Sequence, residues 1–213
     1  MNRRLEEIFS VIPKCEVFAD IGCDHGLMTK AMLVSGKCER AIIADVSAKC
    51  LLKAQELLKD YLDEGRVVSA VSDGFDNLPP CDLALIAGMG GEEIVSILEK
   101  ANSLPNKLVL QPMKNAEKVR RIAISLGYAI KKDYVFYSGG IFYDLICLEK
   151  GKDSITDEEA EFGRDNLKGD NEDFKKLIKI KVEKVNAYLK NPALSIEVRG
   201  EMQSELLRLK KYV

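Results

Sequence analysis

The sequence predicts an α/β protein: a mostly parallel sheet with one antiparallel strand, followed by a C-terminal helical hairpin. Three observations lead to this fold class. Short apolar runs alternate with segments of helical periodicity as far as Gly127, two strand-like runs then flank Ser138-Gly139-Gly140, and no strand signal remains from about Gly151 onward. Alternation of strands and helices is typical of a parallel sheet that helices cover.

Five apolar runs predict the parallel strands, at residues 17–20, 41–45, 67–73, 83–88 and 107–111. Helical periodicity fills the segments between and after them, at residues 27–36, 47–65, 91–102 and 115–127. The last three of these segments end near Gly or Asn, as helices commonly do. Residues 128–150 then predict a hairpin that closes the sheet with an antiparallel strand.

The C-terminal segment has helical spacing of its apolar residues. One set recurs at intervals of four and three, and a second set follows Asn191-Pro192. The two sets are Ile178, Val182, Val185 and Leu189, then Leu194, Val198, Met202, Leu206 and Leu209. We therefore expect a catalytic unit over residues 1–150 and a helical appendage over residues 151–213. Residues 171–213 carry ten Lys or Arg against six Asp or Glu, a net charge of +4, while the rest of the chain carries −6.

The overall composition limits the class of protein. With 213 residues, 46% hydrophobic, the chain can bury one substantial core. Its formal net charge of −2 gives no global signal for nucleic acid, so such a partner needs a local basic patch. The six cysteines form no C-x-x-C pair, one histidine cannot build a metal site, and no apolar run is long enough for a membrane span or a signal peptide. We expect a soluble, cytoplasmic protein without metal.

The stretch from Asp20 to Gly26 predicts a cofactor loop, because an acidic strand end, glycines and a helix follow one another. Dinucleotide-binding loops read G-x-G-x-x-G, whereas here Asp24 stands where its carboxylate would repel a pyrophosphate. The loop therefore favours a cofactor that carries positive charge, and S-adenosylmethionine meets that requirement. A glycine turn that merely connects strand and helix is the alternative.

Two further strands end in an acidic residue. Asp45 can accept hydrogen bonds from ribose hydroxyls, and Asp73 can accept one from an adenine amino group. All three acids are expected at the carboxyl edge of the sheet, where parallel sheets bind ligands. Each alone could be a turn former or helix cap. The ordered set favours a binding site.

Five motifs in one order carry a family resemblance: ADIGCDHG, IADVS, SDGFDNLP, IAGMGG and LVLQP. With the basic helical tail, they resemble the bacterial TrmK family, which methylates ring nitrogen 1 of adenine 22 in tRNA with S-adenosylmethionine. The resemblance implies a Rossmann-like class I methyltransferase. One departure is Met113, which follows Gln111-Pro112 where the family commonly has Asn.

Residue roles follow from the motifs and the resemblance together. The expected cofactor-binding residues are Asp20, Gly22, Asp24, His25, Gly26, Asp45, Val46, Asp73, Gly74, Ala87 and Gly88. Asp24 is also the catalytic candidate, since a carboxylate can stabilise charge that develops on the methylated base; a role only as cofactor ligand stays open. His25 could equally be a structural hydrogen-bonding residue.

The expected tRNA-binding residues fall into two groups. Glycines around Met89 would let a flat base approach the backbone, and basic residues would bind phosphates. The set comprises Arg3, Arg4, Met89, Gly90, Gly91, Gln111, Pro112, Lys175, Lys176 and Lys179. A tight turn is the alternative for the glycines, and a solvated helical face is the alternative for the lysines.

Three other functions remain open at this point. A class I methyltransferase could act on a small molecule or a protein, although the basic tail would then have no role. A nicotinamide-dependent dehydrogenase is disfavoured by Asp24 and by the glycine spacing. A non-catalytic RNA-binding module is disfavoured by the three strand-end acids. The sequence makes no prediction of the oligomeric state.

Overall fold

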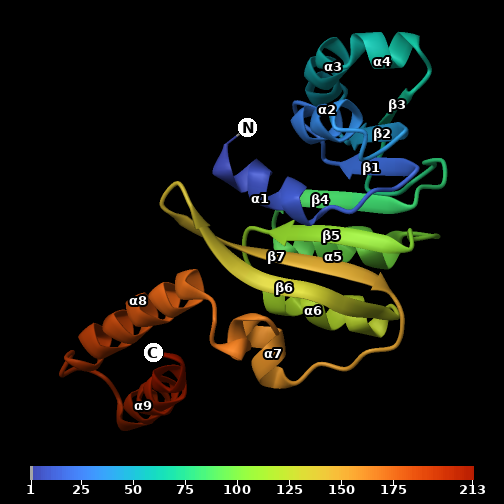
Figure 1. The fold of residues 1–213 in the computed structure, drawn as a ribbon. Helices are drawn as coiled ribbons and strands as arrows, with labels where there is room; N and C mark the ends of the chain where they lie inside the picture. Colours follow the sequence, from blue (N-terminus) through green and yellow to red (C-terminus); the bar gives the residue numbers. More distant parts are fainter. Residues whose placement is uncertain (1) are drawn as a thin grey trace.

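A seven-stranded sheet organises the computed structural model, which describes residues 2–213 (Figure 1). Its strand order is β3-β2-β1-β4-β5-β7-β6. The strands are β1 (Val17–Ile21), β2 (Arg40–Asp45), β3 (Val67–Val71), β4 (Leu83–Met89), β5 (Lys107–Pro112), β6 (Tyr128–Ser138) and β7 (Ile141–Lys150). β7 runs opposite to the other six strands and pairs antiparallel with β5 and β6, so the predicted fold class is confirmed.

Helices cover both faces of the sheet. Residues of α1, α2 and α3 build a core with Phe18 and Ile43 on one face, and residues of α5 and α6 build a second core with Ala19 and Ile42 on the other. The alternating sides of neighbouring strand residues explain this division. These helices are α1 (Arg3–Val11), α2 (Leu27–Val34), α3 (Ala48–Leu57), α4 (Lys59–Asp63), α5 (Gly91–Lys100) and α6 (Ala116–Ser125).

Helix α1 was not predicted from the sequence. The Asn2 side chain caps it by accepting a hydrogen bond of 2.9 Å from the backbone N–H of Leu5. Ile8, in the helix, and Ile12, directly after it, are essentially unexposed. This packing places the first turn of α1 beside the carboxyl end of the sheet.

The C-terminal segment forms the predicted helical hairpin, preceded by a short helix that was not predicted. After α7 (Asp157–Phe162) and a 3-10 turn (Asn166–Lys168) come α8 (Glu172–Leu189), α9 (Ile196–Leu209) and a last 3-10 turn (Lys210–Tyr212). Thr156 and Glu159 cap α7 reciprocally. Phe174 and Ile178 of α8 share a core with Val135 of β6. Figure 1 shows α8 on the same side of the molecule as α1 and the tip of the β6–β7 hairpin. The division of the chain after residue 150 stays a prediction.

A buried ion-pair network joins this segment to the sheet. The Arg120 guanidinium, fully buried, donates to both carboxylate oxygens of Asp133, to Asp144 and to the carbonyl of Ala160. Asp133 also accepts from the backbone N–H of Arg164. The network links α6, β6, β7 and α7, and it holds the start of the helical segment against the sheet.

Within the described residues, no helix is both long and apolar enough to cross a membrane.

Candidate functional site

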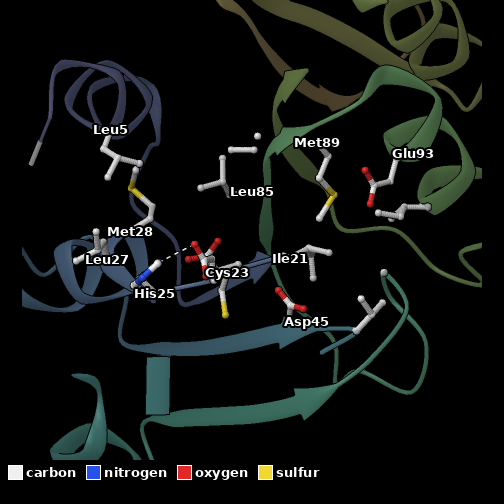
Figure 2. A pocket seen from close by; sticks show the side chains of 18 of the residues that line it. Leu5, Ile21, Cys23, His25, Leu27, Met28, Asp45, Leu85, Met89 and Glu93 are labelled. Carbon is white, nitrogen blue, oxygen red and sulfur yellow. Dashed lines mark hydrogen bonds and ion pairs between the residues drawn. The ribbon is translucent and has the colours of Figure 1, made fainter. Parts of the chain in front are cut away.

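A cavity of about 450 Å³ opens at the carboxyl ends of β1, β2 and β4 (Figure 2). The strand order reverses between β1 and β4, and ligands of open α/β sheets bind at such a reversal. The cavity gathers most of the predicted cofactor residues: Asp20, Gly22, Asp24, His25, Asp45, Val46, Asp73, Gly74, Ala87 and Gly88. Gly26 is absent from the lining and stands at the N-cap of α2.

The glycine loop depends on two positions with left-handed backbone. Gly22 has φ of 72° and Gly26 has φ of 68°, a region that disfavours side chains. A Cβ on Gly22 would meet the methyl carbon of Met89, and one on Gly26 would lie 3.0 Å from Cβ of Ala54. The glycines therefore let β4 and α3 approach the loop closely.

Asp20 is the buried acid of the site, with 6% of its surface exposed. Its carboxylate accepts a hydrogen bond of 2.8 Å from the Thr29 hydroxyl. Burial raises the pKa of Asp20 to about 6, and the hydrogen bonds from Thr29 offset only part of that rise. A positively charged ligand beside this carboxylate would stabilise its ionised form.

Asp24 and His25 form an exposed pair at the tip of the loop. The Asp24 carboxylate lies 2.6 Å from Nδ1 of His25, and Nζ of Lys53 lies 3.4 Å from Nε2 of the same ring (Figure 2 shows His25). Because a lysine ammonium can only donate, the tautomer that fits both contacts is the one in which Nε2 accepts from Lys53 and Nδ1 donates to Asp24. Asp24 itself has φ of 43°, which Asp tolerates better than most residues. The loop thus presents a carboxylate whose orientation His25 restrains.

The other two strand-end acids differ in their surroundings. Asp45 is half-buried, points into the cavity in Figure 2, and accepts a hydrogen bond of 2.8 Å from the backbone N–H of Ser47. Asp73 is exposed and lies 3.7 Å from Nζ of Lys100 on α5. One carboxylate is therefore fixed inside the cavity, while the other stands at its rim with a lysine as partner.

The last two glycines of the IAGMGG motif, Gly90 and Gly91, pack against another part of the protein. A Cβ on Gly91 would lie 2.6 Å from the carbonyl oxygens of Lys114 and Asn115, and one on Gly90 would lie 3.3 Å from Lys114. The Met89 side chain extends over Gly22. Gly91 thus allows close packing of two backbones, while the approach of a flat base to this motif stays a prediction.

Arg4 reaches the cavity from α1. Its Nε donates a hydrogen bond of 2.7 Å to Oε1 of Gln111, and its guanidinium lies 5.4 Å from the centre of the Tyr143 ring. A Cβ on Gly88 would lie 2.9 Å from an Nη atom of Arg4, so the missing side chain leaves room for the guanidinium. Gln111 and Pro112 are buried and outside the cavity lining, and Gln111 reaches the cavity through Arg4.

The remaining predicted tRNA-binding residues lie elsewhere. Arg3 lines a second cavity of about 560 Å³ and comes within 3.8 Å of Asp173. On α8, Lys175 pairs with Glu172, Lys176 lies 4.0 Å from the centre of the Tyr137 ring, and Lys179 is exposed. The structure does not bring these residues together with the strand-end acids.

Several lining residues were missed from the sequence. Asn2 and Leu5 belong to the overlooked α1, whose amphipathic pattern was the available signal. The Ser72 hydroxyl donates to backbone carbonyls of the turn that follows β3, those of Gly74 and Asp76. Glu93 lies on α5, two residues after the IAGMGG motif. Cys23 also lines the cavity, but burial raises the pKa of its thiol, which removes it as a nucleophile. In residues 2–213 no group of three His, Cys, Asp or Glu could hold a metal ion.

Comparison with known proteins agrees with this geometry. Residues 1–146 match the model of a family described as a methyltransferase domain. A Mycoplasma pneumoniae protein, provisionally named a tRNA methyltransferase, is 31% identical over 172 residues, which cover 76% of this chain and 79% of the relative. The tRNA (adenine(22)-N(1))-methyltransferase of Bacillus subtilis is 26% identical over 156 residues, 71% of this chain and 66% of the relative.

A solved structure supports the fold over the full length. TrmK of M. capricolum, in complex with S-adenosyl-homocysteine, superposes with a TM-score of 0.88 at 21% identity, covering 100% of this chain and 97% of that chain. At that identity the likeness establishes the fold, including the C-terminal helices. The family match and the relatives of similar sequence confirm the predicted family: the chain belongs to the methyltransferase-domain family and, within it, to the TrmK family.

Proposed function

We propose that this protein transfers a methyl group from S-adenosylmethionine to ring nitrogen 1 of adenine 22 in tRNA. The observation that carries the proposal is the gathering of three strand-end acids and a glycine loop in one cavity at the carboxyl edge of the sheet. The curated relative from B. subtilis, which carries this activity in its name, supports the choice of nucleotide.

The donor set of the cavity fits this cofactor. Asp45 offers carboxylate oxygens for ribose hydroxyls, and the apolar side chains of Val46 and Ile97 lie in the same lining as Gly74, where an adenine ring would fit. Asp20 and Asp24 provide negative charge for a sulfonium and an ammonium group. The chemistry of these groups therefore suits a cationic adenosine derivative better than a pyrophosphate.

The protein contributes chiefly position and charge to the reaction. S-adenosylmethionine supplies the electrophilic methyl group, and the ring nitrogen must approach it in line with the sulfur. Methylation leaves positive charge on the adenine ring, which the Asp24 carboxylate, oriented by His25, stabilises. Because this interaction strengthens as charge develops, Asp24 would lower the barrier. The alternative is that Asp24 only binds the cofactor.

The RNA side of the reaction requires a surface beside the cavity. A stacked adenine must be extruded at a cost of a few kcal/mol, which phosphate contacts offset. Helix α8 lies on the same side of the molecule as α1, and it carries exposed lysines at 179 and 184 (Figure 1). We assign donor binding to residues 1–150 and phosphate binding to the helical segment 151–213, with the reaction in the cytoplasm.

Methylation of a defined RNA tests the proposal. Unmodified tRNA that carries A22 is incubated with the enzyme and labelled S-adenosylmethionine, and the modified nucleoside is mapped. We expect label at ring nitrogen 1 of A22 and none on a matched tRNA with guanine at position 22. Equal labelling of both tRNAs, or labelling only of proteins or small molecules, would overturn the choice of substrate.

A further inference from the structure

The β6–β7 hairpin ends in an uncharged, partly exposed tip. Residues 134–143 read YVFYSGGIFY, with three of the seven Tyr and two of the seven Phe residues and no charged side chain, in a chain that is 31% charged. The turn is formed by Gly139 and Gly140, which have φ of 59° and 89°. Ile141 follows the turn with 47% of its surface exposed. Single exposed apolar residues are common, so the surroundings of Ile141 decide whether it has a role.

The hairpin extends beyond the rest of the sheet as a two-stranded ribbon. In the described residues, the pairing of β5 with β7 ends at Ile146, whereas β6 and β7 stay paired as far as Ser138 and Ile141. Figure 1 shows the tip projecting past the neighbouring strand β5, on the side of α1. A two-stranded ribbon is at most marginally stable in isolation, so its position depends on the helices beside it.

Each face of the ribbon carries an aromatic ring with a basic side chain close to it. Successive strand residues alternate between faces, which puts Ile141 and Tyr143 on the same face. The Arg4 guanidinium of α1 lies 5.4 Å from the centre of the Tyr143 ring. Nζ of Lys176, on α8, lies 4.0 Å from the centre of the Tyr137 ring. The tip is therefore held between the helix that reaches the main cavity and the helix that carries the exposed lysines.

Ile141 stands beside the main cavity without lining it. Its Cα lies about 7 Å along the strand from that of Tyr143, two residues away. Tyr143 in turn contacts Arg4, and Arg4 lines the cavity. A base that enters the cavity from a stacked RNA therefore leaves its neighbours in the stack close to the tip.

The chemistry of the tip suits the inside of a base stack. Extrusion of a base leaves a gap, and proteins that unstack nucleic acids insert apolar side chains such as Ile between bases. No charge has to be withdrawn from water when residues 134–143 approach the bases. Arg4 and Lys176, on either side of the ribbon, attract the phosphates next to the gap.

We propose that the hairpin tip enters the tRNA beside A22 and that Ile141 fills the gap that the extruded adenine leaves. The turn at Gly139 and Gly140 allows the close approach, because neither residue has a side chain to meet the RNA. Ile141 thus acts on the position of the adenine, whereas the cavity residues act on the donor and on the reacting atoms. The inference rests on the proposed function, since it takes tRNA as the substrate.

Fluorescence of a modified base tests the extrusion directly. A tRNA with 2-aminopurine at position 22 is mixed with the protein and S-adenosyl-homocysteine, so that no methyl transfer takes place, and the fluorescence rises when the base leaves the stack. Ile141→Thr keeps a β-branched residue in the strand but shortens and polarises it, and the rise should fall at least threefold at saturating protein. Val68→Thr is the matched control, because Val68 is also 47% exposed but lies on β3, at the opposite edge of the sheet.

Single-turnover methylation separates extrusion from a structural role. On unmodified tRNA, Ile141→Thr should be at least tenfold slower than wild type, and Ile141→Leu should recover most of the rate. On a tRNA in which the nucleotide that faces A22 is abasic, so that A22 leaves the stack more easily, Ile141→Thr should come within twofold of wild type. Thermal unfolding and donor affinity by calorimetry should be unchanged in every variant.

The outcomes distinguish this inference from the proposed function. If Ile141→Thr slows both tRNAs equally, or methylates both at the wild-type rate, the tip does not extrude the adenine and the inference is wrong while the function stands. A lower oligomer mass of Ile141→Thr by light scattering would assign the tip to contact with a second copy and would also overturn the inference. If wild-type protein labels neither tRNA, the proposed function is wrong, and the inference falls with it.

Discussion

The donor cavity and the C-terminal helices present their charged side chains in opposite ways. The cavity is lined by acids on strand ends and tight turns, where backbone geometry fixes each side chain. Helices α8 and α9 form a small core at Phe174, Ile178 and Leu209, and α8 exposes lysines to solvent. A small cofactor needs fixed groups at a few positions, whereas an RNA backbone can be met by mobile charges over a wide surface.

This difference predicts which property of the protein each mutation should change. Changes at the strand ends should affect donor binding or turnover, and changes on α8 should affect RNA binding and its salt dependence. The buried Arg120 network, which connects the two regions, should affect both through stability. Five predictions test this separation, beginning with the largest expected effect.

Breaking the Arg120 network should cause the largest loss in the free energy of unfolding. Arg120→Leu leaves Asp133 buried without its charged partner, so the free energy of unfolding should fall by about 3–5 kcal/mol. Urea unfolding measures the change. Arg121→Met is the control, because Arg121 is exposed on the same helix and its loss should have little effect. A normal stability for Arg120→Leu would mean that the network does not join the two regions energetically.

Asp20 should make the free energy of unfolding of the protein depend on pH. The pKa of this carboxyl is about 6 in the fold and about 3.9 in an unfolded chain, so the folded state binds more protons between these values. Its contribution is greatest below about pH 4, falls by about 3 kcal/mol as the pH rises to about 6, and is constant above. Asp20→Asn should remove this dependence. Identical pH profiles of unfolding for the two proteins would disprove the assignment.

Asp24 should matter for turnover more than for binding. Asp24→Asn keeps a residue that tolerates the positive φ, yet removes the charge, so the rate of tRNA methylation should fall more than tenfold. Single-turnover kinetics measure the rate, and calorimetry should show a smaller loss of donor affinity than of rate, because Asp20 also supplies negative charge to the donor. A parallel loss of affinity would instead make Asp24 a cofactor ligand.

Asp45 should matter for binding. Asp45→Ala removes a fixed hydrogen-bond acceptor from the cavity, and donor affinity should weaken about tenfold, or about 1.4 kcal/mol. Asp60→Ala, at an exposed acid of α4, serves as the control. Unchanged affinity of Asp45→Ala by calorimetry would remove Asp45 from the cofactor site.

The exposed lysines of α8 should each have a small effect. Lys179→Gln and Lys184→Gln should each weaken tRNA binding a few-fold and reduce the slope of log affinity against log salt by about 0.7–0.9 for each phosphate that is no longer neutralised. Donor affinity should not change. Lys59→Gln on α4, at the opposite end of the molecule in Figure 1, is the matched control. An equal effect of all three would mean that α8 is not the specific RNA surface.

The sequence predicted the parts of the fold that depend on local pattern. The strands β1 and β2 are nearly continuous apolar runs because helices cover both sides of them, and such runs are readable without tertiary information. Asp20, Asp45 and Asp73 were predictable for a related reason, since the carboxyl ends of parallel strands meet at one edge. Helix α1 carries a similar local signal in its capping Asn2 and buried Ile8, which was overlooked.

The contacts that could not be predicted join distant parts of the chain. Arg4 and Gln111 are 107 residues apart, and neither has a local pattern that indicates the hydrogen bond between them. The burial of Arg120 depends on partners from β6, β7 and α7. Gly91 resembles a ligand-binding glycine in sequence, and only the tertiary structure shows its packing against Lys114 and Asn115.

The buried carboxyl of Asp20 has a consequence for the heat of donor binding. A cation that binds beside it lowers its pKa, so binding near pH 6 releases a fraction of a proton to the buffer. The observed enthalpy then varies with the ionisation enthalpy of that buffer, and the apparent affinity rises with pH until the carboxyl is fully ionised in the free protein. Donor binding is thereby coupled to proton release at Asp20.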